Sequence, residues 1–204
     1  QVFARKPAPL QVTWAGYVGT TGLAAMDGLI ADRHHVPEGE EGAYVERALR
    51  LDGGYIVWLP PQEAPPVAPP PFIKNGAITF GCFNNPAKIN APLLDLWARI
   101  LQAMPNARLL LKYRGMPDNK ARIVDALTAR GIDPGRVAIE GSGTALEMLM
   151  RYHAVDIALD TQPYSGGLTT LEALWMGVPV ITFPGATFAG RHSTSYLRHA
   201  RLDD

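Results

Sequence analysis

The chain has 204 residues, 47% of them hydrophobic, which is enough to bury a sizeable core in one large or two small domains. Its 19 basic and 19 acidic residues cancel, so no overall charge would attract nucleic acid or an anionic membrane. No apolar run reaches the roughly 18 to 20 residues that span a bilayer, and no secretory leader opens the chain. We therefore expect a cytoplasmic protein in which the single cysteine, Cys82, is a buried thiol.

The first 59 residues predict part of an α/β layer. Two short runs, QVTWAGY (residues 11–17) and DGLIAD (residues 27–32), have the composition of strands. Residues 34–49 predict a loop followed by a helix. Because 59 residues are too few for a complete layered domain, we expect residues 1–59 to be the last part of a larger lobe.

A proline-rich segment follows. Seven of the twelve residues 60–71 are proline, which cannot donate backbone hydrogen bonds to a sheet and favours extended geometry. We interpret residues 60–76 as a linker or a surface crossover, and residues 77–204 as a second domain.

The second domain alternates between two patterns. Short apolar runs predict strands that are covered on both faces at residues 78–84, 107–113, 136–141, 156–160 and 178–183. Helical spacing lies between them, after the N-cap Asn90 and over residues 119–129 and 144–154. Strands that alternate with helices of this length predict right-handed crossovers and a Rossmann-like α/β fold, a parallel sheet with helices on both faces.

The loop after residues 156–160 carries the most informative motif. Open parallel sheets bind ligands beyond the carboxyl ends of their strands, and here the run SGGLTTLE leads from a strand into a helix. Thr169 and Glu172 fit a capping box, in which each side chain accepts from the other residue's amide. Adjacent glycines permit positive φ and let a ligand approach the backbone, and amides at a helix N-terminus bind anions.

We therefore predict a diphosphate site in this loop. The predicted contacts are Gly166, Gly167, Leu168, Thr169 and Thr170. Glu172 would either cap the helix or accept the two hydroxyls of a ribose. Lys88 follows another strand at the same edge of the sheet, where it is either a phosphate contact or a solvated surface lysine.

Other chemistries are disfavoured by the motifs. Neither G-x-G-x-x-G nor G-x-x-x-x-G-K-[ST] occurs, which disfavours NAD and ATP, and no G-x-S-x-G elbow is present. The five histidines lack the spacing of metal ligands, so we predict neither a metal nor another cofactor. His153 is interpreted as a packing residue rather than a base, and Arg191 as a salt-bridge partner rather than a substrate-binding cation.

Three stretches carry a family resemblance: ARKPAPLQVTWAGYVGTTGLAAMD, GCFNNPAKIN and VDIALDTQPYSGGLTTLEALWMGVPVITFPGATFAGRHSTSYL. They resemble the catalytic region of the O-linked N-acetylglucosamine transferase and Spindly family. The resemblance implies a GT-B glycosyltransferase with two Rossmann-like lobes and a metal-independent nucleotide-sugar site. Residues 77–204 would form the C-terminal, donor-binding lobe, and residues 1–59 the end of the N-terminal lobe.

The resemblance also implies roles for individual residues. Lys88 matches the catalytic lysine that contacts the donor diphosphate, and Asn85 lies beside it. Residues 166–170 match the phosphate loop, Glu172 matches the ribose carboxylate, and residues 16–20 resemble a cleft loop of the N-terminal lobe. Met148 stands where better-known members carry a histidine that stacks on uracil, which leaves the nucleotide open.

The implied reaction is transfer of N-acetylglucosamine from UDP-GlcNAc to Ser or Thr of a protein or peptide, with helical repeats upstream gathering the acceptor. A GDP-fucose donor, an asparagine acceptor, a non-catalytic scaffold that retains the fold and a nucleotide-sugar epimerase are the alternatives. The opening strands and catalytic histidines of the N-terminal lobe are absent from these 204 residues, so this fragment is expected to bind the donor without performing transfer alone.

Overall fold

The computed structural model describes residues 2–202, which divide into two compact units. The smaller unit contains the residues up to Trp58 together with those from Pro184 onward, and the larger unit is Leu59–Phe183. The predicted division placed residues 184–204 in the second domain, whereas the residues from Pro184 pack with the first. Within the described part of the chain, no helix is long and apolar enough to cross a membrane.

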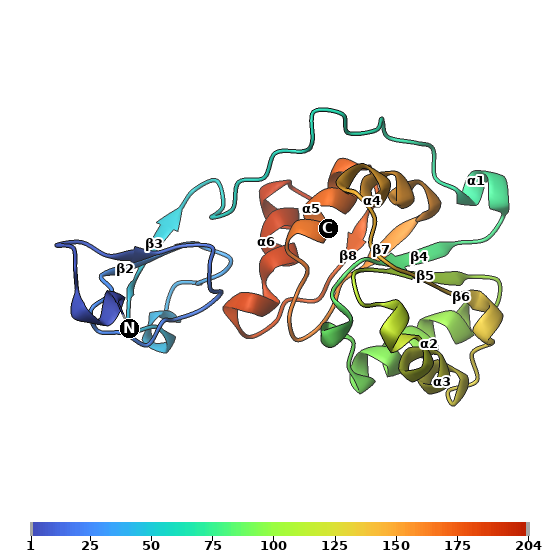
Figure 1. The fold of residues 1–204 in the computed structure, drawn as a ribbon, viewed down its shortest axis with the longest axis horizontal. Coiled ribbons are helices and arrows are strands. Elements are labelled where there is room, and N and C mark those ends of the chain that lie inside the picture. The colour runs from blue at the N-terminus through green and yellow to red at the C-terminus, as the bar shows by residue number, and fades with distance from the viewer. Residues whose placement is uncertain (1, 203–204) are drawn as a thin grey trace. The chain divides into compact units, whose positions relative to one another are not determined.

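The described residues of the larger unit form a five-stranded parallel sheet in the order β6-β5-β4-β7-β8 (Figure 1). The strands are β4 (Thr79–Cys82), β5 (Arg108–Lys112), β6 (Val137–Glu140), β7 (Ile157–Leu159) and β8 (Val180–Ile181). Every strand predicted in this part is present, and each is shorter than its apolar run. The central pairing sets Gly81 of β4 beside Leu110 of β5 and Ala158 of β7. The predicted Rossmann-like layer is therefore confirmed.

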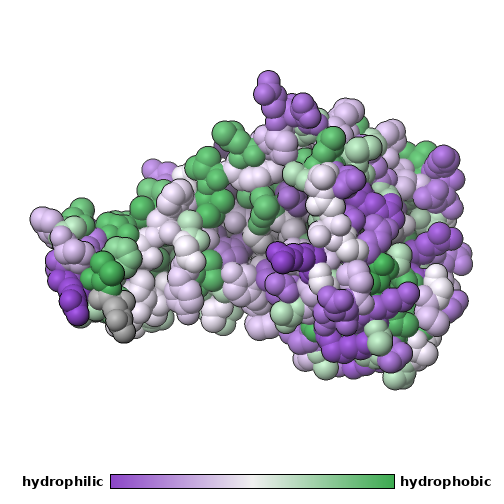
Figure 2. Space-filling view, viewed as in Figure 1, coloured by the Kyte–Doolittle hydropathy of each residue, from purple (hydrophilic) through white to green (hydrophobic). Residues whose placement is uncertain are grey.

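Helices cover both faces of this sheet. Figure 1 shows α2 (Ala91–Ala103) and α3 (Lys120–Thr128) on one face, and α4 (Ala145–Arg151) and α5 (Leu168–Trp175) on the other. Trp97 and Leu101 of α2 pack with Ile123 of α3 in the first core, and Tyr152 packs with Phe83 in the second. Many hydrophilic residues cover the outer side of α2 and α3, purple at the lower right of Figure 2, as expected of amphipathic helices.

Side-chain hydrogen bonds to the backbone cap the starts of α2 and α4. The Asn90 side chain accepts from the backbone N–H of Leu93 at 3.0 Å and caps α2, as predicted. Thr144 and Glu147 form a reciprocal capping box at the start of α4, so that both orphan amides are satisfied by side chains.

The proline-rich segment belongs to the larger unit and packs against the rest of it. His153 Nε2 lies 3.0 Å from the carbonyl oxygen of Pro66, and the Asp156 carboxylate accepts from the amides of Phe72 and Thr79, each at 2.8 Å. The short helix α1 (Phe72–Asn75) ends this segment. Of the two interpretations, a surface crossover fits better than a free linker, and His153 is the packing residue that the sequence predicted.

The described part of the smaller unit contains the parallel strands β1 (Val12–Thr13), β2 (Gly28–Asp32) and β3 (Arg47–Leu51) and the helix α6 (His192–His199). The helix predicted near residue 49 is wrong, because Arg47–Leu51 is a strand paired in parallel with β2. Its sequence, RALRL, has good intrinsic helix propensity. Pairing and half-burial against β2 outweigh that weak preference.

A buried polar network joins α6 to β2 within this unit. The Asp32 carboxylate accepts from Ser195 Oγ at 2.8 Å and lies 2.9 Å from His35 Nδ1, and His35 Nε2 lies 2.9 Å from His192 Nδ1. Burial by itself would raise the pKa of Asp32, but its hydrogen bonds and the charge of His35 outweigh burial and hold that pKa well below its usual value. These bonds explain why the residues from Pro184 belong to the smaller unit.

Candidate functional site

The loops after β4 and β7 meet at the carboxyl edge of the larger sheet, and Lys88 joins them. Its ammonium Nζ donates to the carbonyl oxygen of Ser165 at 2.8 Å and to Asn84 Oδ1 at 3.3 Å. The predicted proximity of Lys88 to the glycine loop is therefore confirmed. The alternative of a solvated surface lysine is wrong, since the side chain is partly buried between these loops.

Lys88 lies among neutral partners. Besides the two oxygen atoms, the Tyr164 ring faces its ammonium at 4.1 Å from the ring centroid, a cation–π contact. Within residues 2–202, Lys88 makes no ion pair with a carboxylate. Burial lowers the pKa of Lys88 to about 8, although the nearby charge of Asp160 opposes this shift. A desolvated cation without a counter-charge in contact is suited to receiving an anion.

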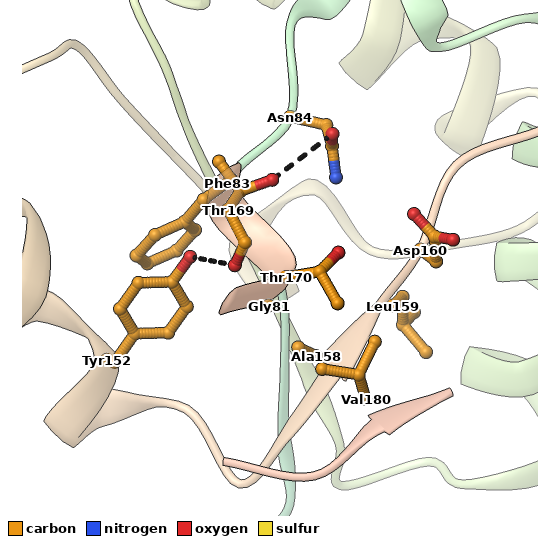
Figure 3. A pocket seen from close by; sticks show the side chains of 10 residues that line it. All are labelled: Gly81, Phe83, Asn84, Tyr152, Ala158, Leu159, Asp160, Thr169, Thr170 and Val180. Carbon is orange, nitrogen blue, oxygen red and sulfur yellow. Dashed lines mark hydrogen bonds between the residues drawn. The ribbon is translucent and has the colours of Figure 1, made fainter. Parts of the chain in front are cut away.

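Helix α5 begins earlier than the predicted capping box requires. Gly167 is its N-cap and Leu168 its first residue, with no side-chain cap, so Thr169 already lies inside the first turn. The predicted capping box of Thr169 and Glu172 is therefore wrong. Thr169 Oγ1 instead donates to Asn84 Oδ1 at 3.3 Å, the same oxygen that accepts from Lys88 (Figure 3).

The first turn of α5 leaves amides available. Within residues 2–202, the structure records no hydrogen bond from the backbone N–H groups of Gly167, Leu168 and Thr169. The Gly166 N–H donates to Asp160 Oδ1 at 2.6 Å and the Thr170 N–H to the Gly167 carbonyl oxygen at 3.2 Å. Of the predicted phosphate-loop residues, Gly166 and Thr170 thus donate their backbone N–H groups to other protein atoms, not to a ligand. The other amides lie at the positive end of the helix dipole, where anions bind.

The two glycines differ in what they contribute, and neither uses the positive φ that glycine permits. A Cβ at Gly166 would lie 2.5 Å from Thr170 Oγ1 and 3.1 Å from Asp160 Oδ1, so a side chain does not fit there. A Cβ at Gly167 would meet nothing within 4 Å. Gly166 therefore permits close packing of the loop, and Gly167 leaves open space at the start of the helix.

Glu172 lies one turn further along α5, partly buried beside Tyr152. Burial raises the pKa of the Glu172 carboxyl to about 7, and the influence of the Tyr152 hydroxyl opposes this shift in part. In the structure the single hydroxyl hydrogen of Tyr152 is donated to the Thr169 carbonyl oxygen at 2.9 Å, which fixes the first turn of α5 against Tyr152 after α4 (Figure 3). Glu172 is thus a carboxyl group poised to ionise near neutral pH, next to the amides of the same helix.

Comparison with models of protein families shows which family the chain belongs to. The model of glycosyl transferase family 41 matches residues 1–57 and 72–202. The chain belongs to glycosyl transferase family 41. The match leaves out residues 58–71, which contain the proline-rich run.

Similar proteins agree with the family. The chain is 40% identical over 208 residues to a protein of Petunia hybrida named probable UDP-N-acetylglucosamine–peptide N-acetylglucosaminyltransferase SPINDLY, covering 98% of this chain and 22% of that protein. It is 30% identical over 200 residues to the SEC protein of Arabidopsis thaliana, which carries the same enzyme description, covering 94% and 20%. This family 41 chain thus spans about a fifth of the length of these relatives.

A solved structure supports the fold of the family 41 chain. A mutant of the Thermobaculum terrenum O-GlcNAc transferase matches 98% of this chain and 38% of its own chain, with a TM-score of 0.92 and 46% sequence identity. The predicted α/β fold of a GT-B glycosyltransferase is confirmed by this match.

The remaining predicted residues have less distinctive surroundings in the family 41 chain. Asn85 is exposed and caps the short 3₁₀ turn Pro86–Lys88, accepting from the Ala87 N–H at 2.9 Å. Met148 is partly buried against the core on the α4 side of the sheet. Arg191 pairs with Glu40 at 2.7 Å, so the predicted salt bridge is confirmed.

The predicted cleft loop, residues 16–20, belongs to the smaller unit, where the Thr20 hydroxyl donates to Glu46 at 2.7 Å. Within the described residues, no group of three or more His, Cys, Asp or Glu side chains is arranged to hold a metal ion.

Sequence reasoning missed Asn84 and Asp160. Asn84 provides the oxygen shared by Lys88 and Thr169, and Asp160 directly follows β7 and binds the glycine loop. A signal was present, because each is a polar residue that directly follows a buried apolar run. Such residues lie at the ligand-binding edge of a parallel sheet.

Proposed function

We propose that this chain forms the nucleotide-sugar donor site of a protein O-glycosyltransferase. The complete protein would transfer N-acetylglucosamine from UDP-GlcNAc to Ser or Thr of proteins, without a metal cofactor. The names of the relatives, UDP-N-acetylglucosamine–peptide N-acetylglucosaminyltransferases, support this donor and a peptide acceptor. The observation that carries the proposal is the convergence of the Lys88 ammonium and the Thr169 hydroxyl of the first turn of α5 on Asn84 Oδ1.

This arrangement suits the charge that develops in the reaction. The acceptor hydroxyl oxygen forms a bond to the anomeric carbon, the bond from that carbon to the diphosphate oxygen breaks, and the hydroxyl proton is lost. The departing UDP gains negative charge as it leaves. Lys88 and the amides of Gly167, Leu168 and Thr169 would stabilise this charge, because donors that are already oriented need little reorganisation in the transition state.

The nucleoside would extend along α5. Ionised Glu172 would accept the ribose hydroxyls, since it lies one turn beyond the amides that hold the diphosphate. Asn85 would contribute a contact beside Lys88. Met148 would face the base through a flexible apolar side chain rather than an aromatic ring, and we expect a weaker preference for uracil than a stacked ring would give.

The rest of the machinery would come from the complete protein. The smaller unit would be the end of the N-terminal lobe, with residues 16–20 contributing to its acceptor side. Helical repeats that gather protein acceptors would precede it, and the cytoplasm would be the compartment.

Calorimetry on the 204-residue chain tests the donor site. We expect UDP to bind, NAD not to bind, and Lys88→Ala to weaken UDP binding by roughly tenfold or more, because a charged hydrogen-bond donor is lost. Lys120→Ala, which removes an exposed lysine of α3, is the matched control and should bind UDP normally. If neither UDP nor GDP binds, or if Lys88→Ala binds as well as the parent chain, the proposal is wrong.

Transfer itself is tested on the full-length protein with peptide acceptors. UDP-GlcNAc and GDP-fucose are supplied in separate reactions, and a scaffold would give no product with either donor. Sugar interconversion without an acceptor would instead indicate an epimerase.

A further inference from the structure

Asp160 lies at the carboxyl end of β7, and its carboxylate accepts hydrogen bonds from several parts of the chain. Its Oδ1 accepts from the Thr161 N–H at 2.8 Å and the Gly166 N–H at 2.6 Å. Its Oδ2 accepts from Ser165 Oγ and Thr182 Oγ1, each at 2.7 Å. The side chain is buried, so these bonds are formed in a site from which water is largely excluded.

These bonds set the path of the glycine loop. Ser165 and Gly166 are drawn toward the end of β7, and Thr182 ties the same carboxylate to the end of β8. The carbonyl oxygen of Ser165 is also the closest recorded acceptor of Lys88. Since the Gly166 N–H is committed to Asp160, the amides that follow it at the start of α5 are the ones left for a ligand.

The carboxylate also acts on Lys88 through space. The titratable groups that influence the Lys88 ammonium or face it are Asp160 directly after β7, the Cys82 thiol of β4 and Tyr164 from the loop between β7 and α5. Asp160 favours the protonated form of Lys88, opposing the effect of burial. Burial raises the pKa of the Cys82 thiol to about 12, so Cys82 carries no charge near neutral pH.

We propose that Asp160 is a positioning residue of the diphosphate site, which fixes the loop of residues 161–166 so that Lys88 and the first amides of α5 receive the donor together. This inference rests on the proposed donor site and adds a residue that never contacts the donor. It assigns Asp160 two effects: alignment of the amides and retention of the proton on Lys88.

The test compares Asp160→Asn with Asp156→Asn in the 204-residue chain. Asp156 is a matched control, because it is equally buried, precedes the same strand at the opposite edge and also accepts two backbone N–H bonds. We expect Asp160→Asn to weaken binding of UDP by about tenfold and Asp156→Asn to leave it unchanged, even if both variants melt at lower temperature. Inorganic pyrophosphate, titrated in parallel, reports the diphosphate contribution alone.

A second readout does not depend on ligand binding. The pKa of Lys88, followed by NMR of isotopically labelled lysine in the unliganded chain, should fall in Asp160→Asn and stay constant in Asp156→Asn. Equal losses of UDP affinity in the two variants would show that Asp160 is merely structural. Parent-like UDP affinity or an unchanged Lys88 pKa in folded Asp160→Asn would also overturn the inference. A parent chain that binds no nucleotide would instead refute the proposed donor site.

Discussion

Lys88 and Thr169 share one acceptor: Lys88 Nζ and Thr169 Oγ1 each lie 3.3 Å from Asn84 Oδ1. The two donors come from residues 81 positions apart, on segments that follow different strands. Asn84 is buried, and its neutral oxygen satisfies both donors without cancelling the charge of Lys88. The shared oxygen therefore joins the cation to the helix start without placing a negative charge in contact with Lys88.

The neutrality of this acceptor can be tested with Asn84→Asp. The variant places a carboxylate beside the ammonium, and we expect the pKa of Lys88 to rise and UDP binding to fall by roughly tenfold or more, since like charges repel the diphosphate. Asn75→Asp adds the same charge at an exposed position of α1 and should bind UDP as the parent does. Calorimetry measures both variants, and undiminished UDP affinity in Asn84→Asp would mean that the diphosphate does not approach Asn84.

Donor binding should have a bell-shaped pH dependence. Binding requires an ionised Glu172 and a protonated Lys88, whose pKa values are about 7 and about 8. Affinity for UDP should therefore rise as the pH increases through about 7 and fall as it increases through about 8. Titrations across this range give the profile.

The variant Glu172→Gln tests whether Glu172 causes the rise of UDP affinity on the acidic side of this pH profile. The amide cannot ionise, so the rise near pH 7 should disappear while the fall at higher pH persists. A variant that keeps both sides of the bell would show that Glu172 is not the group that titrates on the acidic side.

Alanine at Gly166 and alanine at Gly167 should have different effects on stability and on UDP affinity. Gly166→Ala should destabilise the fold by about 1–3 kcal/mol, because the new methyl group overlaps Thr170 Oγ1 at 2.5 Å. Gly167→Ala should lower the melting temperature less than Gly166→Ala does, since its Cβ meets nothing within 4 Å. The methyl group would instead occupy space that the diphosphate needs, so UDP affinity should fall.

Thermal unfolding and calorimetry on the same samples separate these effects. A Gly167→Ala chain that binds UDP normally would place the diphosphate away from this part of the helix.

The sequence predicted those elements of the fold that depend on residues close together in the chain. The strands of the larger unit and the N-cap Asn90 were predictable because buried runs and caps depend on neighbouring residues. The strand Arg47–Leu51 was not, because its pairing with β2 is a tertiary contact that outweighs the helix propensity of RALRL.

The sequence predicted several residues of the site but not the hydrogen bonds among them. Lys88 and the glycine loop stand at strand ends, which the α/β topology brings to one edge. The engagement of the Gly166 amide by Asp160 depends on how the loop folds back, and no spacing rule encodes it. The capping box failed for a related reason: α5 begins at Leu168, one residue before the predicted cap.

The buried bonds from Asp32 to Ser195 and from His35 to His192 have a consequence for dissecting the protein. They make the smaller unit discontinuous in sequence, whereas Leu59–Phe183 is one uninterrupted segment inserted into it. Any deletion that removes the chain after residue 183 would strip α6 from β2 and uncover a charged carboxylate and an imidazole. A minimal donor-binding fragment is therefore better cut at both junctions of the insert than by shortening the chain from its end.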